Sequence, residues 1–329
     1  MMRFNVSDLS AIETRVGAWV SQCAPLLKVF SDNLDPYLDF ATKMTGLPYH
    51  KLASDIKSKD SKIKSEAKRH RQMAKPAVLG AIYRMGGGSW KKDKNGDYYK
   101  SGLWGYAESM GIDMTQEEAH QVVKIFRSSY PEICGNGYNG EMKGIWIQLE
   151  DAVSDVLQGE RTIRKIGPDD CITIDKVTIE NRLPMLRIKL PSGRYLHYLD
   201  AEMRLEKMPW TRTNSETGQI EDVYRMAFTY HGMDQDTHQW RRIVSHGGHI
   251  FENIVQGIAR DVLADKLLEF EEAGLETVGH VHDEGICLSL DDPFAPGVIQ
   301  QESIMNRPVD WALSLPLGSD GFEDYFYHK

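Results

Sequence analysis

The sequence predicts an α+β fold, in which strands and helices are grouped and do not alternate regularly. A strand and a helix open the chain, a mostly helical block follows, and residues 171–230 are rich in β-branched and alternating segments. A long helical segment and an apolar hairpin come next. The 329 residues suffice for one large domain or two modest ones, and 41% hydrophobic residues suffice for a core.

The first half of the chain is predicted to be a strand followed by helices. Residues 2–9 (MRFNVSDL) have the character of a strand, and residues 10–22 repeat apolar side chains every four positions, as a helix does. Residues 91–102 (KKDKNGDYYKSG) predict a polar loop. The further helices expected here are 35–57 with a turn at 46–48, 61–84 ending before Gly86, and 116–129.

The second half opens with segments typical of β-structure. Two alternating segments flank Pro191, Ser192 and Gly193, which predicts a hairpin with its turn at these residues. Residues 249–272 carry a stripe of apolar side chains and predict a helix. Residues 277–290 predict a hairpin around His282 and Asp283.

The bulk composition is that of a chain without a membrane span or signal peptide, because no apolar run is long enough for either. Four cysteines without CxxC spacing argue against a zinc site or a disulfide framework and predict a reducing, cytoplasmic setting. The net charge of −9 and pI of about 5.7, taken alone, count against nucleic-acid binding.

Residues 57–71 form a strongly basic run within this acidic chain. A charge run is usually a solvated helix face, and the alternative is a strip that faces phosphates. Composition leaves both interpretations open. The run holds Lys57, Lys59, Lys62, Lys64, Lys68, Arg69 and Arg71 against Asp60 and Glu66.

Two aspartates stand where apolar strands end or turn. Asp8 ends the first strand, and Asp283 lies in the second hairpin, between His282 and Glu284. Carboxylates in apolar surroundings are costly unless their charge is compensated, and hard divalent cations prefer oxygen ligands. Carboxylates on adjacent strands could hold two ions about 3.5–4 Å apart, as phosphoryl transfer requires. A helix cap at Asp8 or a structural ion pair is the alternative.

The helix between these aspartates has an unusual face. Arg71, Lys75, Leu79 and Tyr83 follow at four-residue spacing, so they are expected to lie along one side. Two cations followed by an apolar and an aromatic side chain suit a nucleoside triphosphate. The alternative is an ordinary amphipathic helix with a basic shoulder. Pro76 predicts a bend or a new turn in this helix.

Four segments carry the strongest signal: DLSAIETR (8–15), RQMAKPAVLGAIYRMGGG (71–88), ENIVQGIARD (252–261) and HVHDE (280–284). They resemble, in this order, motif A, motif B, the helix before motif C, and motif C of family A (Pol I-like) DNA polymerases, especially the bacteriophage members. The four segments keep the family's order and span almost the whole chain, which makes them far more specific together than any one alone.

The resemblance implies a right-hand polymerase fold of which this chain holds the fingers and palm, without thumb or exonuclease domain. It places the palm at 1–34 and 246–329, the latter with helix 249–272, hairpin 277–290 and a C-terminal tail. The fingers would be 35–149, with the motif B helix at 66–84. Residues 150–245 would be a β-rich insertion without an assigned role. With nothing upstream, the first strand of the palm sheet is expected to have an unpaired edge.

The implied activity is that of a DNA-directed DNA polymerase, which transfers deoxynucleotides to a primer 3′ end with two Mg²⁺ ions, or Mn²⁺ as a substitute, in phage DNA replication. The implied partners are primer–template DNA and a dNTP. Three alternatives stay open: a non-catalytic DNA-binding remnant, one piece of a split polymerase that needs a separate chain carrying thumb and exonuclease, and a single-subunit RNA polymerase. Glu13 and Glu284 favour the DNA enzyme over the RNA enzyme.

The resemblance also implies roles for the acidic residues and their neighbours. Asp8 and Asp283 would bind the metal ions, with the backbone carbonyl of Leu9 completing the metal shell. Glu284 would support the catalytic site, and His282 would lie near the primer terminus.

The nucleotide site is implied in the same way. Glu13 would lie under the sugar and exclude a 2′-hydroxyl, and Arg71 and Lys75 would hold the triphosphate. Leu79 replaces the usual motif B aromatic and would lie near the sugar and base. Tyr83 would close over the nascent base pair.

Further interpretations concern other residues of these segments. Tyr37 stands where many members carry a phosphate-contacting histidine. Gln256 would contact the primer–template, aided by Asn253 on the same helical face. Ser10 and Glu13 also match a capping box, so Glu13 could merely cap its helix. A zinc site built from His280 and His282 with His246 or His249 is disfavoured, because no tetrahedral ligand set accompanies them.

Overall fold

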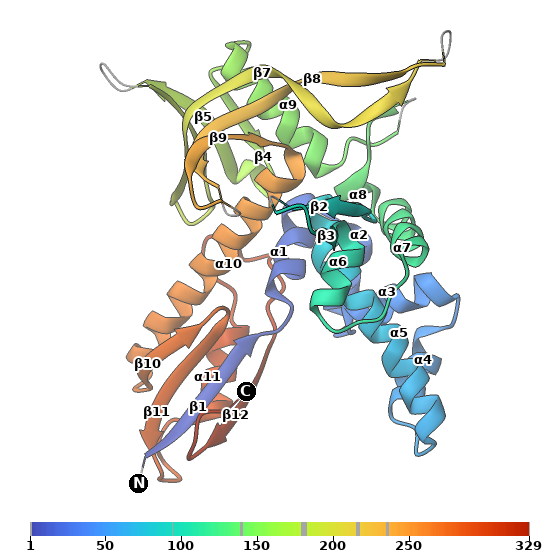
Figure 1. The fold of residues 1–329 in the computed structure, drawn as a ribbon. Helices are drawn as coiled ribbons and strands as arrows, with labels where there is room; N and C mark the ends of the chain where they lie inside the picture. Colours follow the sequence, from blue (N-terminus) through green and yellow to red (C-terminus); the bar gives the residue numbers. More distant parts are fainter. Residues whose placement is uncertain are drawn as a thin grey trace. The chain divides into compact units, whose positions relative to one another are not determined.

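The computed structural model describes residues 2–93, 95–138, 141–178, 183–214, 218–234 and 237–328. The chain forms two compact units (Figure 1). The first contains residues 1–144 and 255–329, and the second contains residues 145–254. Both helices and strands are abundant in separate blocks, so the α+β prediction is confirmed.

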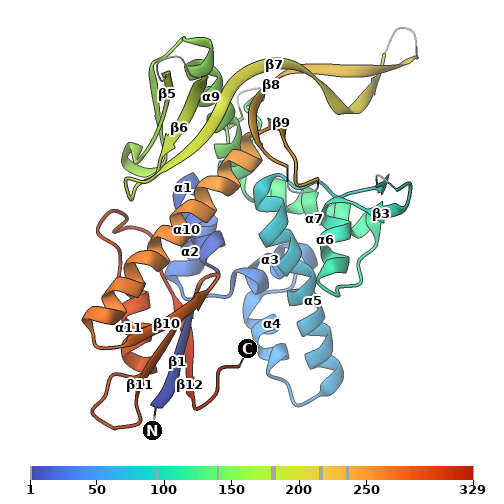
Figure 2. The same cartoon turned by 60° about the vertical axis from the view of Figure 1, so that its left-hand side comes forward.

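A four-stranded antiparallel sheet organises part of the first unit, with the strand order β10-β11-β1-β12. Figure 2 shows β1 between β11 and β12. The prediction that β1 has an unpaired edge is therefore wrong, because β12 near the C-terminus supplies the missing neighbour. The strands are β1 (Met2–Leu9), β10 (Glu276–Val281), β11 (Glu284–Leu290) and β12 (Ser319–Asp324).

Helices α10 (Gly247–Glu272) and α11 (Val298–Asn306) both contact this sheet at β11. Gly285 on β11 lets α10 approach closely, since a Cβ atom there would lie 2.7 Å from the Phe270 ring. From α11, the Gln301 amide donates to the Gly285 carbonyl at 3.0 Å. The predicted helix 249–272 and the hairpin turning at His282 and Asp283 are both confirmed.

The predicted helices of the first half are present, with one difference at the motif B segment. Helix α5 begins at Ser61, runs through Pro76 without a break and ends at Gly80, and Tyr83 lies in the following 3₁₀ turn. The helices of this part are α1 (Ile12–Ser21), α2 (Ala24–Ser31), α3 (Pro36–Thr45), α4 (Tyr49–Ile56), α5 (Ser61–Gly80), α6 (Gly102–Ser109), α7 (Gln116–Ser129) and α8 (Pro131–Cys134).

The loop predicted at 91–102 is wrong for much of its length. Strands β2 (Trp90–Lys92) and β3 (Tyr98–Lys100) pair there as a small antiparallel hairpin. The Lys92 ammonium lies 4.7 Å from the ring centroid of Tyr98, opposite it in the register, which is the kind of cross-strand contact that stabilises a short ribbon. The polar composition of the segment hid this pairing.

The second unit is a six-stranded antiparallel sheet in the order β4-β5-β6-β7-β8-β9, preceded by α9 (Ile145–Gln158). The predicted hairpin at 191–193 is confirmed, with Leu186 opposite Tyr198. The helix α9 was not foreseen. The strands are β4 (Ile163–Ile166), β5 (Ile172–Thr178), β6 (Pro184–Lys189), β7 (Tyr195–Thr213), β8 (Ile220–Met233) and β9 (Trp240–Ser245).

Among the residues described above, no helix combines the length and the apolar character needed to cross a bilayer.

Candidate active site

The pairing of β1 with β11 brings the two predicted metal-binding aspartates to the same end of the sheet. Asp8 stands opposite Glu284 in the register, and the Leu9 amide donates to the Asp283 carbonyl at 3.1 Å. Asp283 follows His282, whose φ of 55° is left-handed and makes the tight turn. Asp283 is thus held at the hairpin tip beside the end of β1.

The carboxylate of Asp8 lies in negative surroundings. Partial burial raises its pKa above the usual value, and the charges of Asp283, Asp320 and Glu284 raise it further. Asp320 is on β12, directly opposite Asp8 in the register, and it accepts a hydrogen bond from the Ser10 hydroxyl at 2.9 Å. Sequence reasoning missed Asp320, because only the pairing of β12 with β1 places it here.

Glu284 is the buried member of this acidic group, with 5% of its surface exposed. The Tyr327 hydroxyl donates to its Oε1 at 2.9 Å. A hydrogen-bond donor near the C-terminus therefore orients the carboxylate that precedes Gly285 on β11. Tyr327 was also missed, since its sequence surroundings carry no motif.

Glu13 joins three parts of the first unit. Its carboxylate accepts from the Tyr83 hydroxyl at 3.2 Å and from the Gln256 amide at 2.7 Å. The capping-box alternative is wrong: the N-cap of α1 is Ala11, with φ 53° and no side-chain capping bond, and Ser10 bonds to Asp320 instead. The predicted site residues of motif A, motif B and the α10 segment thus meet at one carboxylate.

Arg71 and Lys75 lie around the aromatic ring of Tyr37. The Arg71 guanidinium carbon is 5.2 Å and the Lys75 ammonium 6.0 Å from the ring centroid. The Arg71 Nε also donates to Asp35 at 2.6 Å, whereas no carboxylate of the described residues is within ion-pair distance of Lys75. Burial, followed by the charge of Asp35, raises the pKa of Tyr37 to about 12, so its ring stays neutral between the two cations.

The expected single face of Arg71, Lys75, Leu79 and Tyr83 is only partly formed. The first three lie on α5, where Leu79 is half-buried, but the helix ends at Gly80 and Tyr83 follows in a 3₁₀ turn. The tighter winding of that turn breaks the four-residue spacing.

Asn253 and Gln256 share helix α10 but belong to different units. The Asn253 amide donates to the Tyr198 hydroxyl at 3.0 Å within the second unit, while Gln256 bonds Glu13 within the first. His282 is exposed at the hairpin turn. Among the described residues, no three His, Cys, Asp or Glu side chains are arranged to hold a metal ion by themselves.

The basic run ahead of Arg71 is exposed. Six of its cations lie at the surface of the α4–α5 connection and the start of α5: Lys57, Lys59, Lys62, Lys64, Lys68 and Arg69. This exposure is compatible with both a solvated face and a phosphate-facing strip.

Comparison with known proteins agrees with the motifs. The chain is 29% identical over 327 residues to a DNA polymerase of Bacillus phage SP02, a match that covers 99% of this chain and 41% of the relative. This relationship supports the resemblance of the four motifs to those of a bacteriophage DNA polymerase. The chain spans about two-fifths of that relative's length.

A solved structure is also similar: the POL domain of Pol1 from M. smegmatis, in complex with DNA primer–template and dNTP. The match has 14% sequence identity and a TM-score of 0.44, and it covers 98% of this chain and 39% of that chain. No protein-family model matches the sequence.

Proposed function

We propose that this chain is the polymerase region of a DNA polymerase and extends a primer on a template by transferring deoxynucleotides from dNTPs. The observation that carries the proposal is the joining of motifs within one unit. Motif C lies beside motif A through the pairing of β1 with β11, and motif B meets motif A through Tyr83 and Glu13. The phage relative supports the same activity.

The acidic group at the end of the sheet fits divalent cations. Each charge that raises the pKa of Asp8 is another carboxylate, and bound cations would relieve this repulsion. Asp8 and Asp283, with the backbone carbonyl of Leu9, would hold two Mg²⁺ ions, for which Mn²⁺ is a candidate substitute. When bound, the ions would activate the primer 3′-hydroxyl and stabilise the leaving oxygens. Glu284, oriented by Tyr327, would support this group from β11.

The remaining residues would position the substrates for in-line attack of the primer 3′-hydroxyl on the α-phosphorus, with pyrophosphate as the leaving group. Lys75 and Arg71 would hold the triphosphate beside the neutral ring of Tyr37. Glu13 and Tyr83 would form one wall under the sugar and base. Placement of such groups before the substrate arrives lowers the cost of ordering them in the reaction.

Further roles follow from the same proposal. Leu79 would pack near the sugar and base, His282 would lie near the primer terminus, and Gln256 would contact the primer–template. Asn253, whose amide bonds Tyr198, would contact DNA as well. We assign the segments 1–34 and 246–329 to the palm and 35–149 to the fingers. We propose a separate chain carrying thumb and exonuclease as a partner, and phage DNA replication as the setting.

Primer extension tests the proposal. The parent chain is incubated with labelled primer–template, dNTPs and Mg²⁺, and compared with Asp8→Asn and Asp283→Asn. We expect both variants to lose at least about a thousandfold in single-turnover rate, because loss of several kcal/mol of transition-state stabilisation has this size. Asp32→Asn, at an exposed ion pair with Lys28, is the matched control and should behave as the parent does.

Two outcomes would contradict the proposal. Primer extension by Asp8→Asn and Asp283→Asn near the parent rate would show that the two carboxylates take no part in the chemistry. Tight DNA binding by a parent that extends no primer, with or without an added thumb-bearing fragment, would favour the DNA-binding alternative.

A further inference from the structure

A stripe of cations runs along α5 toward the proposed triphosphate site. On a helix, positions at the spacing i, i+4, i+7, i+11 fall within an arc of about 60°. On α5 these positions are Lys64, Lys68, Arg71 and Lys75. The two lysines nearer the start of the helix are exposed, and the other two cations are partly buried around the ring of Tyr37. The stripe therefore leads from the solvent to the pair of cations proposed to hold the triphosphate.

The stripe carries no negative charge of its own. Glu66 is the single acidic residue in the sequence of α5, and it lies about 160° around the helix from Lys64. Arg71 pairs with Asp35 at 2.6 Å, whereas no carboxylate of the described residues lies within ion-pair distance of Lys64 or Lys68. In a chain of net charge −9, this face is a local positive strip that attracts anions.

Two further cations of α5 lie on the other side of the helix. Lys62 and Arg69 are about 160° and about 140° around the helix from Lys64. Hydrogen bonds at Thr115 lower the pKa of Glu118 at the start of α7, and the charge of Arg69 lowers it further, so Arg69 faces α7. Both side chains are exposed, as the first two lysines of the stripe are. They share helix, charge and exposure with the stripe and differ in direction.

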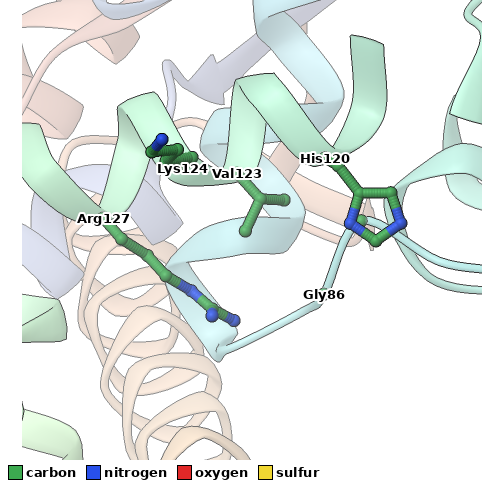
Figure 3. Close-up of a pocket in the computed structure, with 6 residues that line it drawn as sticks. Gly86, His120, Val123, Lys124 and Arg127 are labelled. Atoms are coloured by element: carbon green, nitrogen blue, oxygen red, sulfur yellow. The ribbon is translucent and has the colours of Figure 1, made fainter. Parts of the chain in front are cut away.

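Cations without an acidic partner among the described residues also occur on α7. Figure 3 shows Arg127 reaching from α7 toward the segment that carries Gly86, at a pocket of about 400 Å³ that Lys124 lines as well. Because α7 is a separate helix, these cations do not continue the line of α5 to Arg71 and Lys75. Alignment with the triphosphate site, and not charge alone, therefore distinguishes the stripe.

The spacing and the side-chain chemistry of the stripe suit a passing polyphosphate. The rise of a helix places Lys68 about 10 Å and Lys64 about 16 Å along α5 from Lys75. The Debye length is about 10 Å at 0.1 M salt, so an anion at one cation is still attracted by the next. Lysine presents a point charge on a flexible stem, whereas the rigid fork of arginine suits a fixed phosphate. A stripe one side chain wide favours a single triphosphate over a duplex, whose phosphates follow two strands.

We propose that Lys64 and Lys68 capture the triphosphate group of an incoming nucleoside triphosphate and guide it to Arg71 and Lys75. This inference rests on the proposed polymerase function, because that function places the triphosphate at Arg71 and Lys75. It assigns the exposed half of α5 a role in substrate entry, separate from the chemical step. Electrostatic capture of this kind raises the association rate and weakens as salt rises.

Stopped-flow binding of a fluorescently labelled dATP tests this role. The association and dissociation rates are measured on the full chain without primer–template, so that no chemical step is needed. We compare the parent with Lys64→Glu/Lys68→Glu at about 20 mM and about 300 mM salt, where screening is weak and strong. The matched control is Lys62→Glu/Arg69→Glu, which changes the charge of the same helix by the same amount. Thermal unfolding of each variant verifies that it folds.

We expect Lys64→Glu/Lys68→Glu to lower the association rate about tenfold at low salt and less than about threefold at high salt. Its dissociation rate should change by less than about twofold, because Arg71 and Lys75 still hold the bound triphosphate. The control should lose less than about threefold in association rate at both salt concentrations, since its charges act from the far side of the helix. In primer extension, kcat at saturating dNTP should stay at the parent value for both variants.

Three results would overturn the capture role: a parent-like association rate in Lys64→Glu/Lys68→Glu, an equal loss in the control, or a loss of duplex affinity with an unchanged association rate. The last would mean that the stripe contacts DNA. If the parent extends primers while the stripe variant binds dATP at the parent rate, the capture role fails and the polymerase proposal stands. A chain that captures dATP through Lys64 and Lys68 but never extends a primer would contradict the polymerase proposal and leave the capture role standing.

Discussion

Replacing Glu13 tests the junction of the three motifs. Its carboxylate accepts two hydrogen bonds, and a bond to a charged group contributes about 1.5–3 kcal/mol. The bond from Tyr83, at 3.2 Å, is long, and Gln256 is exposed so that water can replace its bond. We therefore expect Glu13→Ala to lose about 1.5–2 kcal/mol of interaction free energy. This corresponds to a factor of about ten to thirty in an equilibrium or rate constant.

The same change also removes the side chain proposed to exclude a 2′-hydroxyl. We expect Glu13→Ala to lower the preference for deoxynucleotides over ribonucleotides by at least about tenfold. Glu13→Gln keeps the volume of the side chain and loses the charge, so it should keep the preference within about threefold while using both nucleotides less efficiently. Single-nucleotide incorporation gives kcat/KM for each substrate.

Ser10→Ala is the control for a capping role, since Ser10 bonds Asp320 and not the helix end. It should leave the sugar preference unchanged. An unchanged preference in Glu13→Ala, measured in a variant that still unfolds at the parent temperature, would refute the reasoning. The sugar would then lie elsewhere, and the contact with Tyr83 would be structural.

Three further changes address the nucleotide site and the stability of the first unit. Lys75→Gln should raise the apparent dNTP constant by about tenfold and change duplex affinity little, because Lys75 has no acidic partner among the described residues. Equal weakening of dNTP use and of duplex binding would contradict this. Leu79→Tyr should relax discrimination against dideoxynucleotides by about ten- to a hundredfold, because tyrosine adds a hydroxyl donor. Chain-termination assays compare it with the matched control Leu79→Phe. Similar discrimination ratios for both variants would mean that Leu79 does not lie near the sugar. Glu269→Ala should lower the free energy of unfolding in urea by about 3 kcal/mol, because Lys266 is 0% exposed and bonds Glu269 at 2.7 Å. Lys266→Met should leave the free energy of unfolding nearly unchanged. Equal losses in both variants would mean that packing of the side chains dominates.

Much of the fold follows from local patterns in the sequence. The strand at 2–9, the helix that became α10 and the hairpin turning at His282 and Asp283 are set by apolar periodicity and turn chemistry, which act over neighbouring residues. The hairpin at 90–100 was missed because its polar strands are stabilised by cross-strand contacts and lack the alternation of a half-buried strand.

The candidate site shows the same division. The order of the motifs in the sequence already names Asp8, Glu13, Asp283 and Glu284 as a group, because motif residues are recognised without knowing the fold. What only the tertiary structure decides is the set of partners that these residues meet. Asp320 reaches the site through the register of β12 on β1.

Long-range contacts decide the remaining features in the same way. Ser10 and Glu13 match a capping box in sequence, yet the chain turns at Ala11 and the Glu13 carboxylate meets Tyr83 and Gln256 instead. Sequence alone determined many of the helices and strands and most of the residues proposed to carry chemistry. Strand register and side-chain packing, which join residues far apart in the chain, decided where those residues meet.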